Sequence, residues 1–387
     1  MSITAIDKEF VAGTYGRFPL ELVSGKGSIL TASDGKEYID MGSGIGVTAF
    51  GFQDEAWVSA VTAQLGKVQH TSNLYYTEPC ALLAKALCEK TGMKKVFFGN
   101  SGAEANECAI KVARKYSAEK KGADCYTVIT LINSFHGRTL TTLAATGQEH
   151  FHQLFQPLTP GFIHVPANDI AALEEAVASV KTAGIMLECV QGEGGVLPLT
   201  AEFVQAAAKL AKEQDIPLII DEVQTGNGRT GSLYAYQQFG IMPDIVSTAK
   251  GLGGGLPIGA CLMGEKVEGV LGAGDHGSTY GGNPVCCAGA LSVINRLDET
   301  LLASVKEKSA YIFSQLENAE GVESVAGMGL MIGIKTVKNA KEVVNACIAR
   351  GVLCLTAKDK VRLLPALNIP MEQLQKAVAV IKEACRS

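Results

Sequence analysis

Short apolar segments alternate with segments of helical spacing through the middle of this chain, and this alternation limits the possible folds more than any other feature. The runs with the length and composition of buried strands are 96–98, 126–131, 185–190, 217–220, 245–247 and 260–263. The segments between them with helical spacing include 103–120, 169–182 and 201–214. This order predicts an α/β fold in which helices cover both faces of a mainly parallel central sheet.

The two ends of the chain follow a different pattern. Residues 27–40 carry turn signals between short strands, and the part from about 295 onward mixes helices with short strands at 331–335 and 361–364. We therefore expect a large domain formed by 50–294 and a smaller α+β domain built from both ends, 1–49 and 295–387. A chain of 387 residues, 47% of them hydrophobic, is long enough for two or three domains.

Composition and charge exclude several classes of protein. A formal net charge of −5 gives no long-range attraction to nucleic acid or to an anionic membrane surface. Residues 1–10 lack the apolar core of a signal peptide, and no apolar run is long enough to span a bilayer. The eleven cysteines include no C-x-x-C motif, so we expect neither a disulfide framework nor a metal site. These features predict a soluble, cytoplasmic protein.

The first candidate site segment is 97–106, in which an apolar strand turns through small polar residues into a helix. Free amides at a helix start, the Ser101 hydroxyl and the close approach that Gly102 permits together suit a phosphate group. Ser101 followed three residues later by Glu104 also matches an ordinary capping box. The segment alone is therefore compatible with a phosphate site or with a simple helix cap.

The second candidate is Asp221, which with Glu222 ends the apolar run 217–220. A carboxylate at such a position is unfavourable unless it has a cationic partner. A pyridinium nitrogen is such a partner, because a buried carboxylate beside it raises the pKa of the ring nitrogen and keeps the ring an electron sink. The alternative is a surface loop after a core strand.

The third candidate is Lys250, which follows the run 245–247 and precedes the glycine-rich segment 251–259. A lysine in a confined apolar site has a lowered pKa and can bond covalently to an aldehyde. The glycines come after the lysine and lack the G-x-G-x-x-G order before a helix, which argues against a dinucleotide site. No phosphate-binding G-x-x-x-x-G-K-[ST] motif occurs either.

Two arginines complete the candidate set. Arg138 lies in a turn after the run ending near 132, and Arg362 has apolar neighbours in the segment 360–365. An arginine in apolar surroundings needs an anion, and its planar guanidinium suits a carboxylate. A structural salt bridge is the alternative for each arginine.

Taken together, these residues and several longer segments resemble the class III (ω-type) aminotransferases that depend on pyridoxal 5′-phosphate (PLP), in particular the acetylornithine and succinylornithine group. The resemblance covers nearly the whole chain, through segments 14–17, 72–75, 135–139, 191–195, 221–231, 247–259, 278–284 and 362–367. It implies PLP fold type I. The chain departs from many relatives at 51–55, where a G-H-x-H-P motif is missing, and at 187–190, which reads LECV in place of L-E-P-I.

The resemblance also implies roles for individual residues. Lys250 would hold PLP covalently and move the proton during catalysis, and Asp221 would pair with the ring nitrogen. Gln224 would hydrogen-bond the ring hydroxyl, while Phe135 and Val223 would pack on opposite faces of the ring. The remaining cofactor-binding residues would be Ser101, Gly102 and Ala103 at the phosphate, His136, and Thr279.

Thr279 resembles a residue that reaches the phosphate from a neighbouring subunit, so the resemblance implies a homodimer with shared active sites. Arg362 would bind the α-carboxylate of the substrate and Arg138 the distal carboxylate of glutamate, while Glu193 would pair with an arginine. Tyr15 and Ser278 complete the implied substrate-binding set. The set contains no metal ligand.

The implied reaction transfers the amino group of N-acetyl-L-ornithine to 2-oxoglutarate, giving N-acetyl-L-glutamate 5-semialdehyde and L-glutamate in arginine biosynthesis. Ile45 occupies the position at which ornithine δ-aminotransferases have a tyrosine, which favours an acylated donor. Succinylornithine, succinyl-diaminopimelate, ornithine and 4-aminobutyrate remain open, because one methylene or acyl group changes discrimination by only about 1–3 kcal/mol. A non-catalytic PLP-fold binding protein and a dehydrogenase are alternatives of other classes.

Overall fold

The computed structural model describes residues 2–386 and is organised around a seven-stranded sheet. The strand order is β4-β12-β11-β10-β7-β5-β6. The strands are β4 (Lys95–Gly99), β5 (Thr127–Leu131), β6 (Phe162–Val165), β7 (Thr182–Leu187), β10 (Leu218–Asp221), β11 (Ile245–Thr248) and β12 (Gly259–Met263). Only β12 runs antiparallel to its neighbours within this sheet, so the predicted mainly parallel sheet is confirmed.

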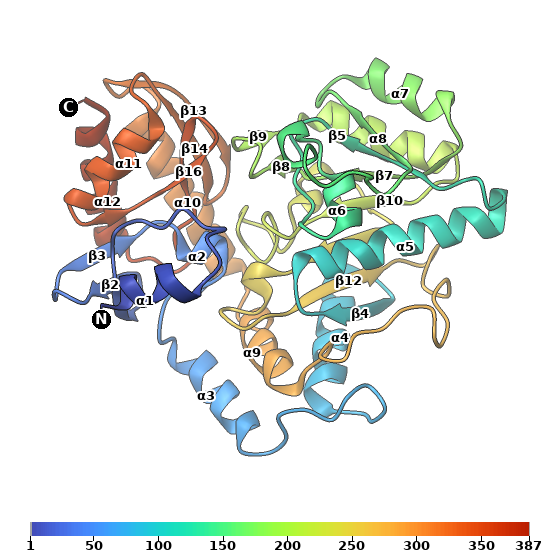
Figure 1. Ribbon diagram of the computed structural model, residues 1–387, viewed down its shortest axis with the longest axis horizontal. Coiled ribbons are helices and arrows are strands. Elements are labelled where there is room, and N and C mark those ends of the chain that lie inside the picture. Colours follow the sequence, from blue (N-terminus) through green and yellow to red (C-terminus); the bar gives the residue numbers. More distant parts are fainter. Residues whose placement is uncertain (1, 387) are drawn as a thin grey trace.

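Alternate residues of the central strands enter two separate cores, one on each face of the sheet. In β10, Ile219 packs with residues of α5 (Gly102–Lys121), whereas Leu218 and Ile220 belong to the cluster that includes α8 (Ala201–Glu213). Successive side chains of a strand point to opposite faces of the sheet, so a strand with both faces buried sends alternate residues into the two cores. The predicted covering of both faces by helices is therefore confirmed, and Figure 1 shows α5 and α8 beside the strands.

Other helices pack around the sheet. α3 (Glu55–Leu65) and α4 (Glu78–Thr91) both contact α9 (Pro284–Ile294), while α7 (Ile170–Ser179) contacts α8 and β6. Smaller elements connect these parts: α6 (Leu140–Ala145), the hairpin β8 (Val190–Gln191) with β9 (Leu197–Pro198), and the 3-10 helices Glu149–Phe151, Ala235–Phe239 and Lys250–Leu252. Of these helices, α4, α6, α7 and α8 contact strands of the central sheet directly.

The two ends of the chain, blue and red in Figure 1, lie on the same side of the molecule. They meet in one sheet of order β1-β2-β3-β15, in which β15 pairs parallel with β3. A second sheet has the order β13-β14-β17-β16. These elements are β1 (Leu22–Lys26), β2 (Ile29–Ala32), β3 (Glu37–Asp40), β13 (Val322–Met328), β14 (Met331–Thr336), β15 (Val352–Leu353), β16 (Leu355–Ala357) and β17 (Lys360–Leu363). The helices at the ends are α1 (Ile3–Phe10), α2 (Ser43–Gly46), α10 (Glu299–Leu316), α11 (Ala340–Ala349) and α12 (Met371–Arg386). We propose that residues 50–294 form one domain and that residues 1–49 and 295–387 together form the other. The pairing of β3 with β15 supports this division.

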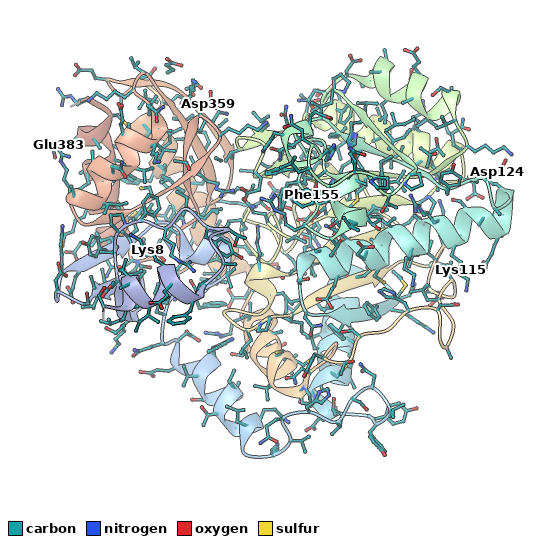
Figure 2. The ribbon with its side chains drawn as sticks, in the orientation of Figure 1. Lys8, Lys115, Asp124, Phe155, Asp359 and Glu383 are labelled. Carbon is teal, nitrogen blue, oxygen red and sulfur yellow. The ribbon has the colours of Figure 1, made fainter. Side chains whose placement is uncertain are left out.

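Charged side chains lie mainly on the outside. Figure 2 shows Lys115 on α5 and Asp124 just beyond that helix at the outer edge of the molecule. Asp124 pairs with Lys181 at 2.5 Å, and both side chains are more than half exposed. Within residues 2–386, no helix combines the length and the apolar character needed to cross a membrane. The eleven cysteines all lie in this described part and are free thiols.

Candidate active site

A cavity of about 480 Å³ lies where β4, β10 and β11 end, which is where ligands bind in sheets of this type. Helix starts and loops from distant parts of the sequence form its walls. The predicted site residues that line it are Ser101, Gly102, Ala103, Phe135, His136, Arg138, Asp221, Val223, Gln224 and Lys250. The fold therefore brings together most of the residues that the sequence singled out.

Lys250 lies two residues beyond β11 and has a backbone φ of 45°. Residues other than glycine rarely adopt such angles, and those that do are concentrated at functional sites. Lys250 is only partly exposed where it lines the cavity, so burial removes water from around its amine. This desolvation lowers the pKa of Lys250 to about 8, against the opposing effect of the nearby carboxylate of Glu193. The amine is therefore available as a neutral nucleophile close to neutral pH.

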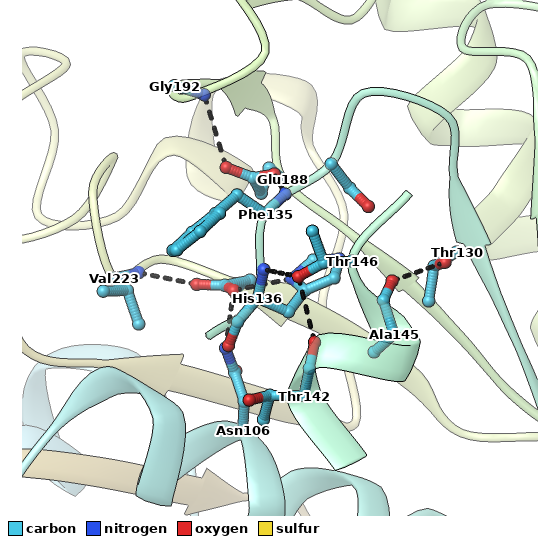
Figure 3. Close-up of polar contacts among 12 residues, drawn as sticks. Asn106, Thr130, Phe135, His136, Thr142, Ala145, Thr146, Glu188, Gly192 and Val223 are labelled. Carbon is cyan, nitrogen blue, oxygen red and sulfur yellow. Dashed lines mark hydrogen bonds and ion pairs between the residues drawn. The ribbon is translucent and has the colours of Figure 1, made fainter. Parts of the chain in front are cut away.

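The carboxylate of Asp221 is buried at the end of β10 and accepts three hydrogen bonds. Oδ2 accepts from Nδ2 of Asn106 and from Nδ1 of His136, each at 2.8 Å, and Oδ1 accepts from the amide of Val223 at 3.0 Å. Figure 3 shows Asn106, His136 and Val223 converging in this way. Burial alone would lower the pKa of His136, but the hydrogen bond and the charge of Asp221 outweigh it and raise that pKa. The carboxylate is thus fixed in position and supported as an anion.

The Ser101 hydroxyl caps α5, whereas the Glu104 carboxylate pairs with the amide of the residue before the cap and not with that of Ser101, so the full capping box is not formed. The hydroxyl accepts from the amide of Glu104 at 3.2 Å, and the Glu104 carboxylate accepts from the amide of Asn100 at 2.9 Å. The ordinary helix cap considered from the sequence is therefore present. The amides of Gly102 and Ala103 lie in the first helical turn, where no helical carbonyl can pair with them. These two amides can therefore donate hydrogen bonds to an anion at the cavity wall.

Gly102 is needed for the packing of this helix start. A Cβ atom at Gly102 would lie 2.7 Å from Cγ1 of Val223, which is closer than carbon atoms can approach. Glycine therefore lets α5 lie directly against Val223 in the cavity wall.

Arg362, Glu193 and Gln224 form a triangle beside the cavity. Nη1 of Arg362 lies 2.6 Å from Oε1 of Glu193 and 3.1 Å from Oε1 of Gln224, and Nε2 of Gln224 donates to Glu193 at 3.2 Å. The Arg362 side chain is only 3% exposed, and its Nε has no hydrogen-bond partner among residues 2–386. The charge of Arg362 keeps the pKa of Glu193 below its ordinary value although burial acts in the opposite direction.

Arg138 lies at the exposed side of the same cavity. Its guanidinium carbon stands 4.0 Å from the ring centre of Phe151 and 5.3 Å from that of Phe135. No ion pair of Arg138 occurs within the described residues, in contrast to Arg362. An arginine that lies over aromatic rings in this way keeps its hydrogen-bond donors available for an anionic ligand.

Five predicted residues do not line this cavity, and two of them, Glu193 and Arg362, lie beside it in contact with the lining residue Gln224. Tyr15 is 72% exposed and lines a separate cavity near the N-terminus. Ser278 and the exposed Thr279 line a different cavity, with residues of the segment 70–77. Ser278 nevertheless approaches the phosphate end, because its hydroxyl accepts from Nδ2 of Asn100 at 3.0 Å. Within one chain, Thr279 and Tyr15 therefore line cavities other than the one that Lys250 lines.

The cavity lining also contains residues that the sequence did not point to, and Asn106 and Glu188 are the two among them that contact the polar network of the site. Glu188 accepts from the amides of Phe135 and Gly192, at 2.9 and 3.3 Å, and burial raises its pKa to about 7. It follows the apolar run of β7 as Asp221 follows that of β10, so the same signal could have identified it. Asn106 lies four residues after Gly102, which places both on one helix face.

A family model for "Aminotransferase class-III" matches residues 10–385 of the chain. The chain belongs to the class-III aminotransferases. This confirms the family indicated by the sequence and identifies the chain as a PLP-dependent transaminase with the type I fold.

Several relatives of this class-III aminotransferase are close in length and sequence. An acetylornithine aminotransferase of Haemophilus ducreyi is 52% identical over 383 residues, which is 98% of each chain. The solved N-acetylornithine aminotransferase of Stenotrophomonas maltophilia has a TM-score of 0.84 at 34% identity, covering 99% of this chain and 98% of the other. An ornithine aminotransferase from Toxoplasma gondii has a TM-score of 0.94 at 30% identity, covering 99% and 93%.

The residues of this class-III aminotransferase fit its cofactor. The amides of Gly102 and Ala103 suit the phosphate, and the amine of Lys250 has the lowered pKa that bonding to an aldehyde requires. The fixed anion of Asp221 suits a protonated ring nitrogen. When bound, PLP supplies the electron sink for chemistry at the carbon that carries the amino group. The protein supplies the hydrogen-bond donors, the charged side chains and the enclosing cavity.

Proposed function

We propose that this enzyme transfers the amino group of N-acetyl-L-ornithine to 2-oxoglutarate, giving N-acetyl-L-glutamate 5-semialdehyde and L-glutamate. The similar acetylornithine aminotransferases support the donor, since one of them is 52% identical over 98% of the chain. The 30% identity to an ornithine aminotransferase gives weaker support for free ornithine. The named reaction places the enzyme in arginine biosynthesis.

The observation that carries this proposal is the presence of two unlike arginines, Arg138 in the cavity wall and Arg362 in the triangle beside that wall. Arg362 is buried, pairs with Glu193 and has an Nε without a hydrogen-bond partner among residues 2–386, which suits a carboxylate that both substrates share. Arg138 is exposed and stacked on aromatic rings, which suits the second carboxylate of glutamate and 2-oxoglutarate. Glu193 can balance the charge of Arg362 when no second carboxylate is bound.

The amine of Lys250 is the group that would carry the proton between the substrate and the cofactor. Its lowered pKa leaves a useful fraction of neutral amine near neutral pH, which is the condition for an efficient general base. Glu193 and Arg362 act on that pKa in opposite directions, so their pairing also tunes the base.

We further propose a homodimer with shared active sites, in which Thr279 contacts the phosphate of the other subunit. The exposed position of Thr279, in a cavity separate from that of its own Lys250, supports this assignment. The hydrogen bond from Asn100 to Ser278 ties the Thr279 loop to the phosphate end of the chain's own site. We also propose a cytoplasmic location, which eleven free thiols suit.

A donor panel with 2-oxoglutarate as the common acceptor tests the proposed substrate. The panel contains N-acetylornithine, succinylornithine, succinyl-diaminopimelate, ornithine and 4-aminobutyrate, each compared by kcat/KM for glutamate formation. We expect N-acetylornithine to exceed ornithine by at least about 10-fold, the discrimination that one missing group allows. A higher kcat/KM for another donor would replace N-acetylornithine as the substrate.

A further inference from the structure

The loop that follows β3 forms a left-handed helical turn. Ser43, Gly44, Ile45 and Gly46 have φ values of 48°, 61°, 66° and 73°, and ψ is 39° at Gly44 and 49° at Ile45. The amide of Val47 donates to the carbonyl of Ser43 at 2.7 Å, which closes the turn. Only glycine adopts these angles without strain, and a β-branched residue such as Ile45 is a clear outlier. This turn therefore needs external support.

The support comes from Asp40, whose side chain is buried at the end of β3. Its two carboxylate oxygens accept from consecutive amides, Oδ1 from Gly42 at 2.8 Å and Oδ2 from Ser43 at 3.0 Å. Burial raises the pKa of Asp40, and the two amides and the charge of Arg229 act against that shift. A carboxylate held in so unfavourable a place is consistent with a specific structural task.

The turn lies against the segment that contains the site lysine. A Cβ atom at Gly251 would lie 3.4 Å from the carbonyl oxygen of Gly46, so the two backbones approach closely next to Lys250. Val47, the residue that follows the turn, lines the same cavity as Lys250. Ile45 is 42% exposed, so burial of its side chain does not compensate for its backbone conformation.

We propose that Asp40 is a positioning residue that holds the turn Ser43–Gly46 in its left-handed form and so fixes Val47 in the cavity wall. Asp40 touches neither substrate nor cofactor in this role. Without both hydrogen bonds, the turn relaxes at Ile45, and the wall beside Lys250 shifts. In this way a buried aspartate of the N-terminal sheet supports the site formed by the central sheet.

The first experiment measures hydrogen exchange of residues 41–50 in the PLP-loaded enzyme by mass spectrometry. Asp40→Asn retains one acceptor oxygen and loses the other, so we expect exchange at Gly42 and Ser43 to accelerate roughly 2- to 12-fold, the effect of one hydrogen bond. Asp34→Asn is the matched control, because Asp34 accepts a single amide in an exposed turn. Unchanged exchange in Asp40→Asn would overturn the proposal.

The second experiment is a double-mutant cycle with Ile45→Gly, since glycine adopts the left-handed turn without help. Asp40→Asn should raise KM by at least about fivefold with little change in kcat, and this effect should largely vanish in the Ile45→Gly background. Gln53→Gly, which relieves a φ of 54° elsewhere, should not restore KM. An equal effect of Asp40→Asn in both backgrounds would contradict the proposal.

If Asp40→Asn does not fold, the double variant Asp40→Asn with Ile45→Gly decides the matter. Recovery of folding in the double variant supports the proposal, and failure of both variants overturns it. The kinetic measurement rests on the proposed function, whereas hydrogen exchange does not. An absence of transamination in the unmutated enzyme would therefore be distinguishable from a failure of this inference.

Discussion

Nδ1 of His136 lies 2.8 Å from Oδ2 of Asp221, and neither side chain is more than 3% exposed. The histidine amide donates to the hydroxyl of Thr146 at 2.9 Å, which fixes the backbone behind the ring (Figure 3). The imidazole therefore orients the carboxylate and stabilises its charge, although it would not itself need to touch a substrate.

We expect His136→Phe to weaken PLP binding by roughly 10- to 150-fold, because a buried charge-assisted hydrogen bond contributes about 1.5–3 kcal/mol. The dissociation constant of PLP, measured by fluorescence titration of cofactor-free protein, tests this. His152→Gln is the control, because His152 is buried but contacts the carbonyls of Leu143 and Thr146. Equal PLP affinity in both variants would show that His136 does not contribute to cofactor binding.

The lowered pKa of Lys250 predicts how covalent attachment of PLP depends on pH. The neutral amine reacts, so the attachment rate should rise with pH and level off above about 8, whereas an ordinary lysine would level off only near 10.5. Glu193→Gln should move this midpoint to lower pH, because the Glu193 carboxylate favours the charged amine. Stopped-flow absorbance gives the midpoint, and Glu202→Gln on α8 should leave it unchanged.

Lys250→Ala should fold, bind PLP without a covalent bond and lose activity by at least the roughly 10²–10⁴-fold typical of a general acid–base group. Mass spectrometry after borohydride reduction provides the readout, with Lys212→Ala as a surface control. PLP fixed to Lys250→Ala would show that another lysine holds the cofactor.

Arg138 and Arg362 should differ in which half-reaction they serve. Arg362→Ala should slow both halves by roughly 10- to 150-fold, since about 1.5–3 kcal/mol of charge-assisted bonding is lost. Arg138→Ala should slow the glutamate half more than the acetylornithine half. Single-turnover absorbance changes of the cofactor with each substrate alone measure the two halves. Equal losses in Arg138→Ala would make it a general organiser of the site.

The two lysine variants of these arginines provide a further check on geometry. Lysine keeps the charge but not the planar fork, so Arg138→Lys and Arg362→Lys should restore little of the lost rate. Full recovery with lysine would show that charge alone is needed.

The proposed role of Thr279 predicts complementation between subunits. Thr279→Ala and Lys250→Ala proteins, mixed under conditions that exchange subunits, should form heterodimers with one intact and one doubly altered site. Partial activity should return on mixing, in proportion to the heterodimers measured by native mass spectrometry. Heterodimers without activity would argue against a shared site.

The strands and helices around the site could be predicted because their patterns are local. The runs at 96–98 and 245–247 are short, apolar and followed by turn residues, and they form β4 and β11. β6 is not predicted from the sequence, because its four residues are interrupted by the polar His164 and give too short an apolar run.

Contacts between distant residues could not be predicted from spacing. Glu193 and Arg362 are 169 residues apart, and their 2.6 Å contact joins the loop between β8 and β9 to β17. The backbone angle of Lys250 is likewise imposed by tertiary packing, since lysine has no preference for positive φ. Residue types could therefore suggest the chemistry, while the fold decides which of them meet.

The pairing of β3 with β15 has a consequence for synthesis on the ribosome. β3, residues 37–40, is synthesised well before its pairing partner β15 at 352–353. At a synthesis rate of about 5–20 residues per second, the delay is roughly 15–60 s. During that interval the edge of β3 is open to pairing with other chains. We expect nascent chains stalled before residue 352 to be aggregation-prone clients of chaperones, even when the central sheet has already folded.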